Sequence, residues 1–202
     1  MLLGPKYKIC KRLGSAVFEK CQTQRFQLAE ARSPRKQSRK RGGNSDYGAQ
    51  LLEKQKARFQ YGLSEKQFSR YAHEAMEGVG SSATALIGRL EARLDNAVYR
   101  AGLTKTRRAA RQLVSHGHLT VNGRRVNIPS YHLEVGDVVA VRPESRGSAL
   151  FINRAETAVE TRTPEWMKMD ADGFSFDTVK IPISTETELP WSASTIIQFY
   201  SR

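Results

Sequence analysis

The feature that most constrains the fold is the order of helix and turn signals between residues 89 and 142. Apolar residues recur twice at helical spacing, and Gly102 and Gly117 stand where the two helices are expected to end. Asn122-Gly123 then separates two short alternating segments, which is the strongest short-range signal for a two-residue β-hairpin. A Gly-Asp turn leads into a final apolar strand. The stretch therefore predicts a small module of two helices and an antiparallel sheet.

The two expected helices carry their charges differently. In the first, over residues 90–101, Arg93 lies off the apolar stripe, and Asp95 is expected to form an internal salt bridge. The second is expected to begin after Thr104, whose hydroxyl suits an N-cap, and to turn Ala109 toward the core. Its start also carries three arginines, although the helix dipole there favours an anion. A phosphate bound at this helix end would explain Arg107, Arg108 and Arg111.

Further groups suited to phosphate or sugar follow in the same module. His116 and His118 flank the second helix end, and Asn122 with Arg124 and Arg125 surrounds the hairpin tip. Two readings stay open for the arginines, namely a solvated basic face and an RNA-binding surface. Two interpretations also stay open for the histidines, namely metal ligation and a helix end that faces RNA phosphates or sugar hydroxyls. Metal ligation would need further ligands that the sequence does not suggest.

Three phrases in this stretch resemble a known family. They are RLDNAVYRAG, TRRAARQLVSHGHLTVNGRRVNIPSY and the GD that precedes the final strand. The segment is similar to the S-four-type RNA-binding domain, and in particular to that of the bacterial-type small ribosomal subunit protein four family. The resemblance covers most of the chain, from Leu3-Gly4-Pro5 to the terminal Phe-Tyr-Ser-Arg.

The resemblance implies an α+β fold in which a small α/β RNA-binding domain is inserted into a helical domain, with the C-terminal tail packed back on the helical domain. The implied parts are a basic arm (1–44), the helical domain (45–88, completed by 183–202), the RNA-binding domain (89–150) and an extension of it (151–182). The implied function is structural. Such a protein binds small-subunit ribosomal RNA and nucleates assembly of the subunit body. It also lines the channel through which messenger RNA enters the subunit, and it influences translational accuracy together with small-subunit proteins five and twelve.

The charge distribution agrees with a polyanionic partner. The 202 residues carry a net charge of +13, which is a statement about partners rather than about fold. Residues 1–50 hold 12 basic and 3 acidic side chains and residues 85–150 hold 11 and 5, whereas residues 151–202 hold 5 and 8. RNA contact is therefore expected from the arm and the central module. No membrane, small-molecule substrate or cofactor is expected, and the chain is expected to be cytoplasmic, since it lacks a long apolar run.

The first 44 residues are expected to be rich in loops, with glycine and proline breaking any long periodicity. Arg39, Lys40 and Arg41 belong to a basic run that is expected to contact RNA near the messenger RNA. Relatives within the family can carry a four-cysteine zinc site in this arm. Here only Cys10 and Cys21 are present, so no metal is expected.

The helical domain is expected to start with a helix that Ser45 or Asp46 caps and that ends at Gly62. Ser64 begins a second helix whose aromatic stripe, including Phe68, is expected to pack rather than to stack on bases. Residues 78–84 are expected to form a loop. The residues of the first helix that are expected to contact RNA are Tyr47, Lys54 and Arg58.

The chain is expected to continue with a helix over residues 149–160 and a second hairpin around Asp170 to Gly173. No catalytic arrangement is suggested, so an enzyme is not expected. Two rivals stay open at this point: an RNA-modifying enzyme, since pseudouridine synthases carry the same small module, and a free-standing RNA chaperone or a binder of stalled ribosomes.

Overall fold

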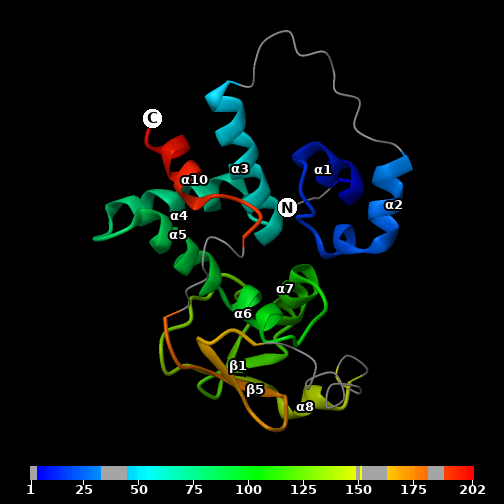
Figure 1. Ribbon diagram of the computed structural model, residues 1–202. Coiled ribbons are helices and arrows are strands. Elements are labelled where there is room, and N and C mark those ends of the chain that lie inside the picture. Colours follow the sequence, from blue (N-terminus) through cyan, green and yellow to red (C-terminus); the bar gives the residue numbers. More distant parts are fainter. Residues whose placement is uncertain (1–3, 33–44, 149–150, 152–162, 182–188) are drawn as a thin grey trace. The chain divides into compact units, whose positions relative to one another are not determined.

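The structure is a computed structural model that describes residues 4–32, 45–148, 151, 163–181 and 189–202 (Figure 1). It contains two compact units, residues 1–86 with 185–202, and residues 87–184. The first is helical and the second combines helices with a sheet, so the expected α+β class is confirmed.

The second unit is built on a five-stranded antiparallel sheet with the order β2-β1-β3-β5-β4. Its strands are β1 (Leu119–Val121), β2 (Arg124–Val126), β3 (Val138–Val141), β4 (Met167–Met169) and β5 (Ser175–Thr178). Its helices are α6 (Leu94–Arg100), α7 (Arg107–Ser115) and the short α8 (Pro143–Arg146), with the end of α5 (Ser82–Glu91).

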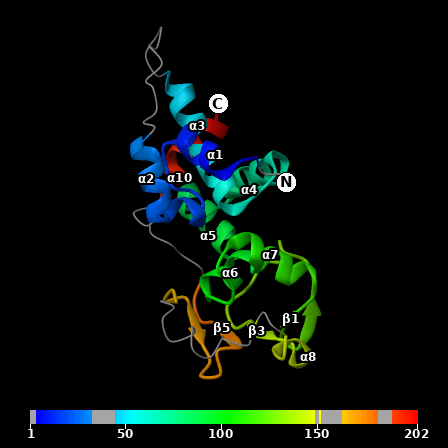
Figure 2. The same cartoon turned by 90° about the vertical axis from the view of Figure 1, so that its right-hand side faces the viewer.

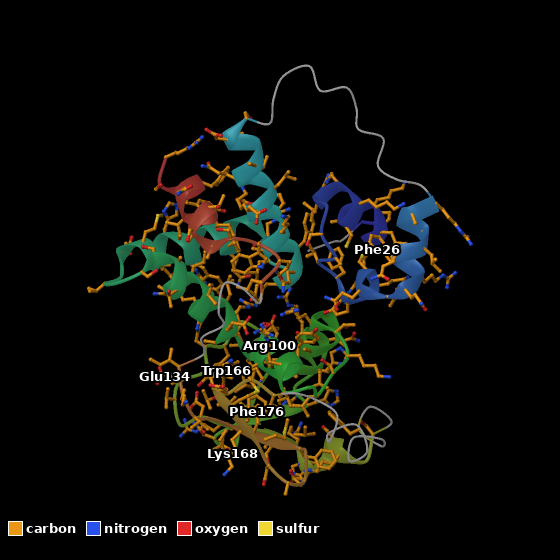
Figure 3. The ribbon with its side chains drawn as sticks, viewed as in Figure 1. Phe26, Arg100, Glu134, Trp166, Lys168 and Phe176 are labelled. Carbon is orange, nitrogen blue, oxygen red and sulfur yellow. The ribbon has the colours of Figure 1, made fainter. Side chains whose placement is uncertain are left out.

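The core of this unit lies between α6, α7 and one face of the sheet. Leu119 and Val121 of β1 point into it, because alternate residues of a strand face the same side. Leu113 of α7 contributes from the helical side. Trp166 and Phe176, labelled in Figure 3, complete the core beside β4 and β5.

The Asn-Gly hairpin is confirmed. Leu119 pairs with Val126, and the two turn residues both have positive φ, 50° at Asn122 and 77° at Gly123. This is the backbone of a type I′ turn, which matches the twist of the strands it joins. The second expected hairpin is also present, as β4 and β5.

The helix expected over residues 90–101 is confirmed over residues 94–100 as α6, but it starts later than expected, because the chain breaks between α5 and α6. Arg93 has extended backbone angles and bridges to His132, and the Leu133 N–H donates to the Ala92 carbonyl. The Leu94 N–H also donates to the Tyr131 carbonyl. Pairing with a distant segment has therefore replaced one helical turn.

Two further boundaries differ from expectation. Helix α7 is capped by Thr106, whose hydroxyl accepts from the Ala109 N–H, and not by Thr104, whose hydroxyl donates to the Thr106 carbonyl. Ala109 is exposed rather than turned inward. Helix α5 already begins at Ser82, inside the segment expected to be a loop.

The first unit has its principal helices in α3 (Asp46–Tyr61), α4 (Glu65–Glu77) and α10 (Ala193–Tyr200). The hydroxyls of Ser45 and Ser64 accept backbone N–H groups at the starts of α3 and α4, and Gly62 ends α3 in the left-handed conformation. Phe68 is fully buried, which confirms the packing interpretation. Helix α10 packs against α3 and α4 in both views (Figures 1 and 2), so the expected return of the tail to this domain is confirmed.

The expectation that the first 44 residues are mainly loop is wrong for the part that the structure describes. It contains α1 (Lys6–Leu13), a 3-10 helix η1 (Glu19–Gln22) and α2 (Gln24–Arg32). Phe26, labelled in Figure 3, forms a small core with Phe18, with Cys10 and Cys21, both 1% exposed, and with Phe59 of α3. Burial raises the pKa of the Cys21 thiol to about 12, so it stays protonated and serves as a packing group.

The helix expected over residues 149–160 lies outside the described residues except for Phe151, which is buried in the core of the second unit. None of the described helices is long and apolar enough to cross a bilayer.

Candidate nucleic-acid interface

The arginines at the start of α7 lie in three different environments. Arg108 is exposed, whereas Arg107 and Arg111 are partly buried. Both of these lie beside polar side chains of α6, to which their guanidinium groups are bonded. The expected basic edge is therefore present, but only Arg108 has a side chain that the fold leaves largely in solvent.

Asp95 holds two arginines at once. Arg111 donates to its Oδ2 atom through Nε at 2.8 Å and through Nη2 at 2.7 Å. Arg93 donates to Oδ1 at 3.1 Å and to Oδ2 at 3.0 Å. The internal salt bridge expected for Asp95 is present. Arg93 itself is only 2% exposed, so its expected contact with RNA is corrected here to a structural role.

Arg107 is held by a second set of contacts. Its Nε atom donates to Oδ1 of Asn96 at 2.9 Å, and its guanidinium lies 4.3 Å from the centre of the Tyr99 ring. Asn96 in turn donates to the carboxylate of Glu91 at 3.0 Å, and Arg100 (Figure 3) donates to that carboxylate at 2.9 Å and 3.1 Å. The start of α7 is thus tied to two buried acids.

The other end of α7 carries a second basic group. Arg125 donates to the His116 carbonyl at 3.3 Å, and Arg142 donates to the Gly117 carbonyl at 3.3 Å. Cations suit this end of a helix, where carbonyl groups and the dipole are negative. Sequence reasoning missed Arg142. The sequence could have indicated it only by its position, because Arg142 is a basic residue that directly follows the apolar strand at Val138–Val141.

The two histidines lie near this end, with ring centres 6.0 Å apart. His116 is exposed, and Nδ1 of His118 lies 3.0 Å from Oγ of Ser145. In the part of the chain that the structure describes, no three His, Cys, Asp or Glu side chains gather as metal ligands.

Gly117 leads to a test of how Arg125 is placed. Its φ is +72°, and a Cβ built there would overlap the Arg125 guanidinium. We expect Gly117→Ala to lower the free energy of unfolding by about 1–2 kcal/mol through backbone strain and to displace Arg125. Urea unfolding and RNA affinity measure the two effects. Gly123→Ala is the matched control, because its φ is +77° and no atom lies within 4 Å of the added group. Equal RNA affinities for the two variants would contradict a role for the Arg125 position.

At the hairpin tip the expected residues separate into two kinds. Arg124 and Arg125 are exposed. Asn122 is also exposed, but its side chain bridges two turns: Nδ2 donates to Asp137 at 2.8 Å, and Oδ1 accepts from the Val138 N–H at 2.9 Å. Its amide is thus already engaged in the sheet, and Thr104 likewise bonds to nearby backbone.

Lys54 of the helical unit does not fit its expected role at an RNA surface. It is 7% exposed, its Nζ atom donates to Glu65 at 2.7 Å, and it lies 4.3 Å from the centre of the Phe199 ring. This ion pair between a buried lysine and a partly exposed glutamate joins α3 to α4 beside α10. We correct its assignment to a structural one.

Arg58 and Tyr47 are both more exposed than Lys54. Arg58 is partly buried and donates to Glu65 at 3.1 Å. Burial opposes ionisation of Glu65, but hydrogen bonds from Lys54 and Tyr200 and the charge of Arg58 hold its pKa below the usual range. Tyr47 is 53% exposed. Arg39, Lys40 and Arg41 lie outside the described residues.

Comparison with known families agrees with this division of the chain. A family model described as the S4 domain matches residues 92–139, and a model described as the ribosomal protein S4/S9 N-terminal domain matches residues 1–91. The chain belongs to the ribosomal protein uS4 family. The matched S4 domain contains α6, α7, β1 and β2, and therefore also Arg107, Arg111 and the hairpin tip.

Full-length relatives support the same assignment. The protein named small ribosomal subunit protein uS4 of Persephonella marina is 44% identical over 203 residues, with 98% of each chain covered. The uS4 protein of Roseiflexus castenholzii is 45% identical over 205 residues, with 99% of this chain and 98% of the relative covered. That of Acetivibrio thermocellus is 41% identical over 203 residues, with 98% of each covered. The similarity therefore extends through both units.

Proposed function

We propose that this protein is a structural constituent of the small ribosomal subunit that binds small-subunit ribosomal RNA through its S4 domain. The observation that carries the proposal is the set of arginines around α7 and the hairpin, in a domain that matches the S4 family model. Arg108 and Arg124 are exposed there, while Arg107 and Arg111 lie partly exposed in fixed positions.

The chemistry of these groups suits an RNA backbone. Guanidinium groups match phosphate oxygens bidentately, and they keep their charge at any physiological pH. RNA helices hide the base edges of their deep major groove, so that proteins mostly recognise their shape, phosphates and 2′-hydroxyls. A protein with a net charge of +13 also gains from releasing the counterions of the RNA. Binding of this kind needs no metal or cofactor.

The finer roles rest on the family resemblance. We propose that binding to the ribosomal RNA nucleates assembly of the subunit body. We also propose that the protein lines the channel through which messenger RNA enters the subunit, and that it influences translational accuracy together with small-subunit proteins five and twelve. The work would take place on cytoplasmic ribosomes. Arg39, Lys40 and Arg41 remain candidates for the contact with messenger RNA.

Binding to a multi-helix junction tests the proposal. We expect the protein to bind a small-subunit ribosomal RNA junction fragment more tightly than a plain RNA duplex of equal length, because a folded junction brings several phosphate groups within reach of fixed arginines. Filter binding from low to moderate salt measures both affinities. The logarithm of the binding constant should fall with the logarithm of salt by roughly 0.7–0.9 per phosphate neutralised.

A control separates specific recognition from bulk charge. A basic peptide of the same net charge should show the salt dependence without any preference for the junction. Equal affinity of the protein for the junction and the duplex would contradict the proposed recognition of small-subunit RNA.

A further inference from the structure

Two acids of the second unit are buried, in a protein whose proposed ligand is an anion. Glu91 is 0% exposed and Asp95 is 4% exposed. A buried carboxylate is unfavourable unless it is paired and hydrogen-bonded, because ionised groups lose their hydration. Both acids satisfy this condition with arginine or asparagine side chains of the same unit. The fold therefore gives each a fixed set of cationic or polar partners.

Asp95 is itself held rigidly. Its N–H donates to the Pro129 carbonyl at 3.1 Å, and the Leu94 N–H donates to the Tyr131 carbonyl at 2.8 Å. Arg93 fills one side of its carboxylate with two hydrogen bonds. The remaining approach to Oδ2 is taken by Arg111 of α7, through Nε and Nη2. Because a guanidinium group is planar, these two bonds fix the direction of the whole group.

Glu91 acts on α7 through an intermediate. Its carboxylate accepts hydrogen bonds from Arg100 and from Asn96. The side chain of Asn96, held in this way, accepts a hydrogen bond from Nε of Arg107. The Tyr99 ring lies under the same guanidinium. Arg107 is thereby held from one edge and one face.

We propose that Asp95 and Glu91 are positioning residues for RNA recognition, which hold the guanidinium groups of Arg111 and Arg107 in place before RNA binds. This inference rests on the proposed RNA binding by the S4 domain. Long side chains lose rotamer freedom when they are immobilised at an interface, and here that loss has already occurred on folding. Acids inside the interface would then increase affinity for an anion.

The sign of one substitution separates this role from bulk electrostatics. Asp95→Asn removes a negative charge and changes the net charge from +13 to +14. Long-range attraction alone would make the variant bind RNA more tightly. Loss of the anchor would instead release Arg111 and leave Arg93 with a weaker acceptor, so that affinity falls although the protein becomes more positive. We expect a loss of about tenfold.

Asp177→Asn is the matched control. Asp177 lies in β5 of the same unit and is exposed, and its substitution makes the same change in net charge. The full-length chain is used for both variants, with filter binding to the ribosomal RNA junction fragment at one salt concentration and thermal unfolding followed by circular dichroism. The expected result is weaker binding for Asp95→Asn and unchanged or slightly tighter binding for Asp177→Asn. Affinity of a folded Asp95→Asn variant equal to that of Asp177→Asn would overturn the proposal.

A second measurement needs no altered acid, in case Asp95→Asn does not fold. In the RNA-free protein, the Nε–H NMR signals of Arg107 and Arg111 should be resolved and slow to exchange with water, and that of exposed Arg108 should exchange rapidly. Arg→Lys variants at these positions assign the signals. Rapid exchange at all three would refute positioning before binding. Failure of the unaltered protein to prefer the junction would instead refute the proposed function, so that the two failures remain distinct.

Discussion

Reversing two exposed arginines of the S4 domain, Arg108→Glu together with Arg124→Glu, is expected to weaken binding to small-subunit ribosomal RNA by about a thousandfold. A hydrogen bond to a charged group contributes about 1.5–3 kcal/mol, and each 1.4 kcal/mol corresponds to a tenfold change in affinity. Two such contacts are lost and two like charges face the phosphates. Filter binding measures the affinity, and the salt dependence should become shallower by roughly 1.4–1.8 in its logarithmic slope.

The fold should tolerate this double variant, since both side chains are exposed. Reversing Arg107 and Arg111 would be a poorer test. A glutamate at position 111 would face the buried carboxylate of Asp95, and the resulting repulsion would confuse binding with stability. Thermal unfolding of the Arg108, Arg124 variant should therefore remain close to that of the unaltered protein.

Lys168→Glu together with Lys180→Glu provides the comparison. Both lysines are exposed in the same unit, Lys168 on β4 (Figure 3) and Lys180 after β5. Each double variant has a net charge of +9, because each reversal removes two positive units from +13. The lysine variant should lose tenfold affinity at most. Equal losses in both variants would mean that RNA senses only the net charge, and the arginine surface would then be wrongly placed.

The parts of the fold that sequence reasoning predicted correctly are those set by local chemistry. The hairpin at Asn122-Gly123 follows from the need for two successive positive φ angles, which this dipeptide meets better than almost any other. The start of α3 at Ser45 and the end at Gly62 follow from caps that act within one helical turn. Signals of this kind need no knowledge of the rest of the chain.

The errors at the candidate site have a tertiary origin. Arg93 looked like a surface residue of one continuous helix, because nothing within a few residues shows that Leu133 and Tyr131 will pair with the backbone beside it. Lys54 and Arg58 are one helical turn apart and resemble an exposed basic face. Helix α10, which places the Phe199 ring over Lys54, lies far along the chain.

The predictions for the N-terminal segment and for the start of α7 were wrong for different reasons. In α1, many lysines and arginines obscured the apolar spacing of Ile9 and Leu13. Before α7, Thr104 and Thr106 are both acceptable caps by residue type, and only the geometry selects Thr106. Composition could identify the anionic partner, but it could not assign each arginine to solvent, to a carboxylate or to a carbonyl.

Removing the indole of Trp191 is expected to destabilise the helical unit by about 3–5 kcal/mol, the range for a buried aromatic side chain replaced by alanine. Trp191 is 3% exposed, and its Nε1–H donates to Oε1 of Gln60 at 2.7 Å. It also lies edge-on to the Tyr61 ring, 6.2 Å away between centres. These contacts attach the start of α10 to the end of α3. Their loss should also weaken the hydrogen bond from Tyr200 to Glu65 at the other end of α10.

The two tryptophans of the chain allow the effect to be located. Trp191 belongs to the helical unit and Trp166 to the core of the other unit, so Trp191→Ala leaves a fluorophore that reports only on the second unit. In urea, the circular dichroism of this variant should begin to change at a lower concentration, while the fluorescence midpoint of Trp166 should shift much less. The reciprocal variant Trp166→Ala should destabilise the second unit and leave Trp191 fluorescence nearly unchanged. A Trp191→Ala protein that unfolds at the same urea concentration as the unaltered chain would show that α10 does not stabilise the helical unit, because truncation of a well-packed indole cannot otherwise be without effect.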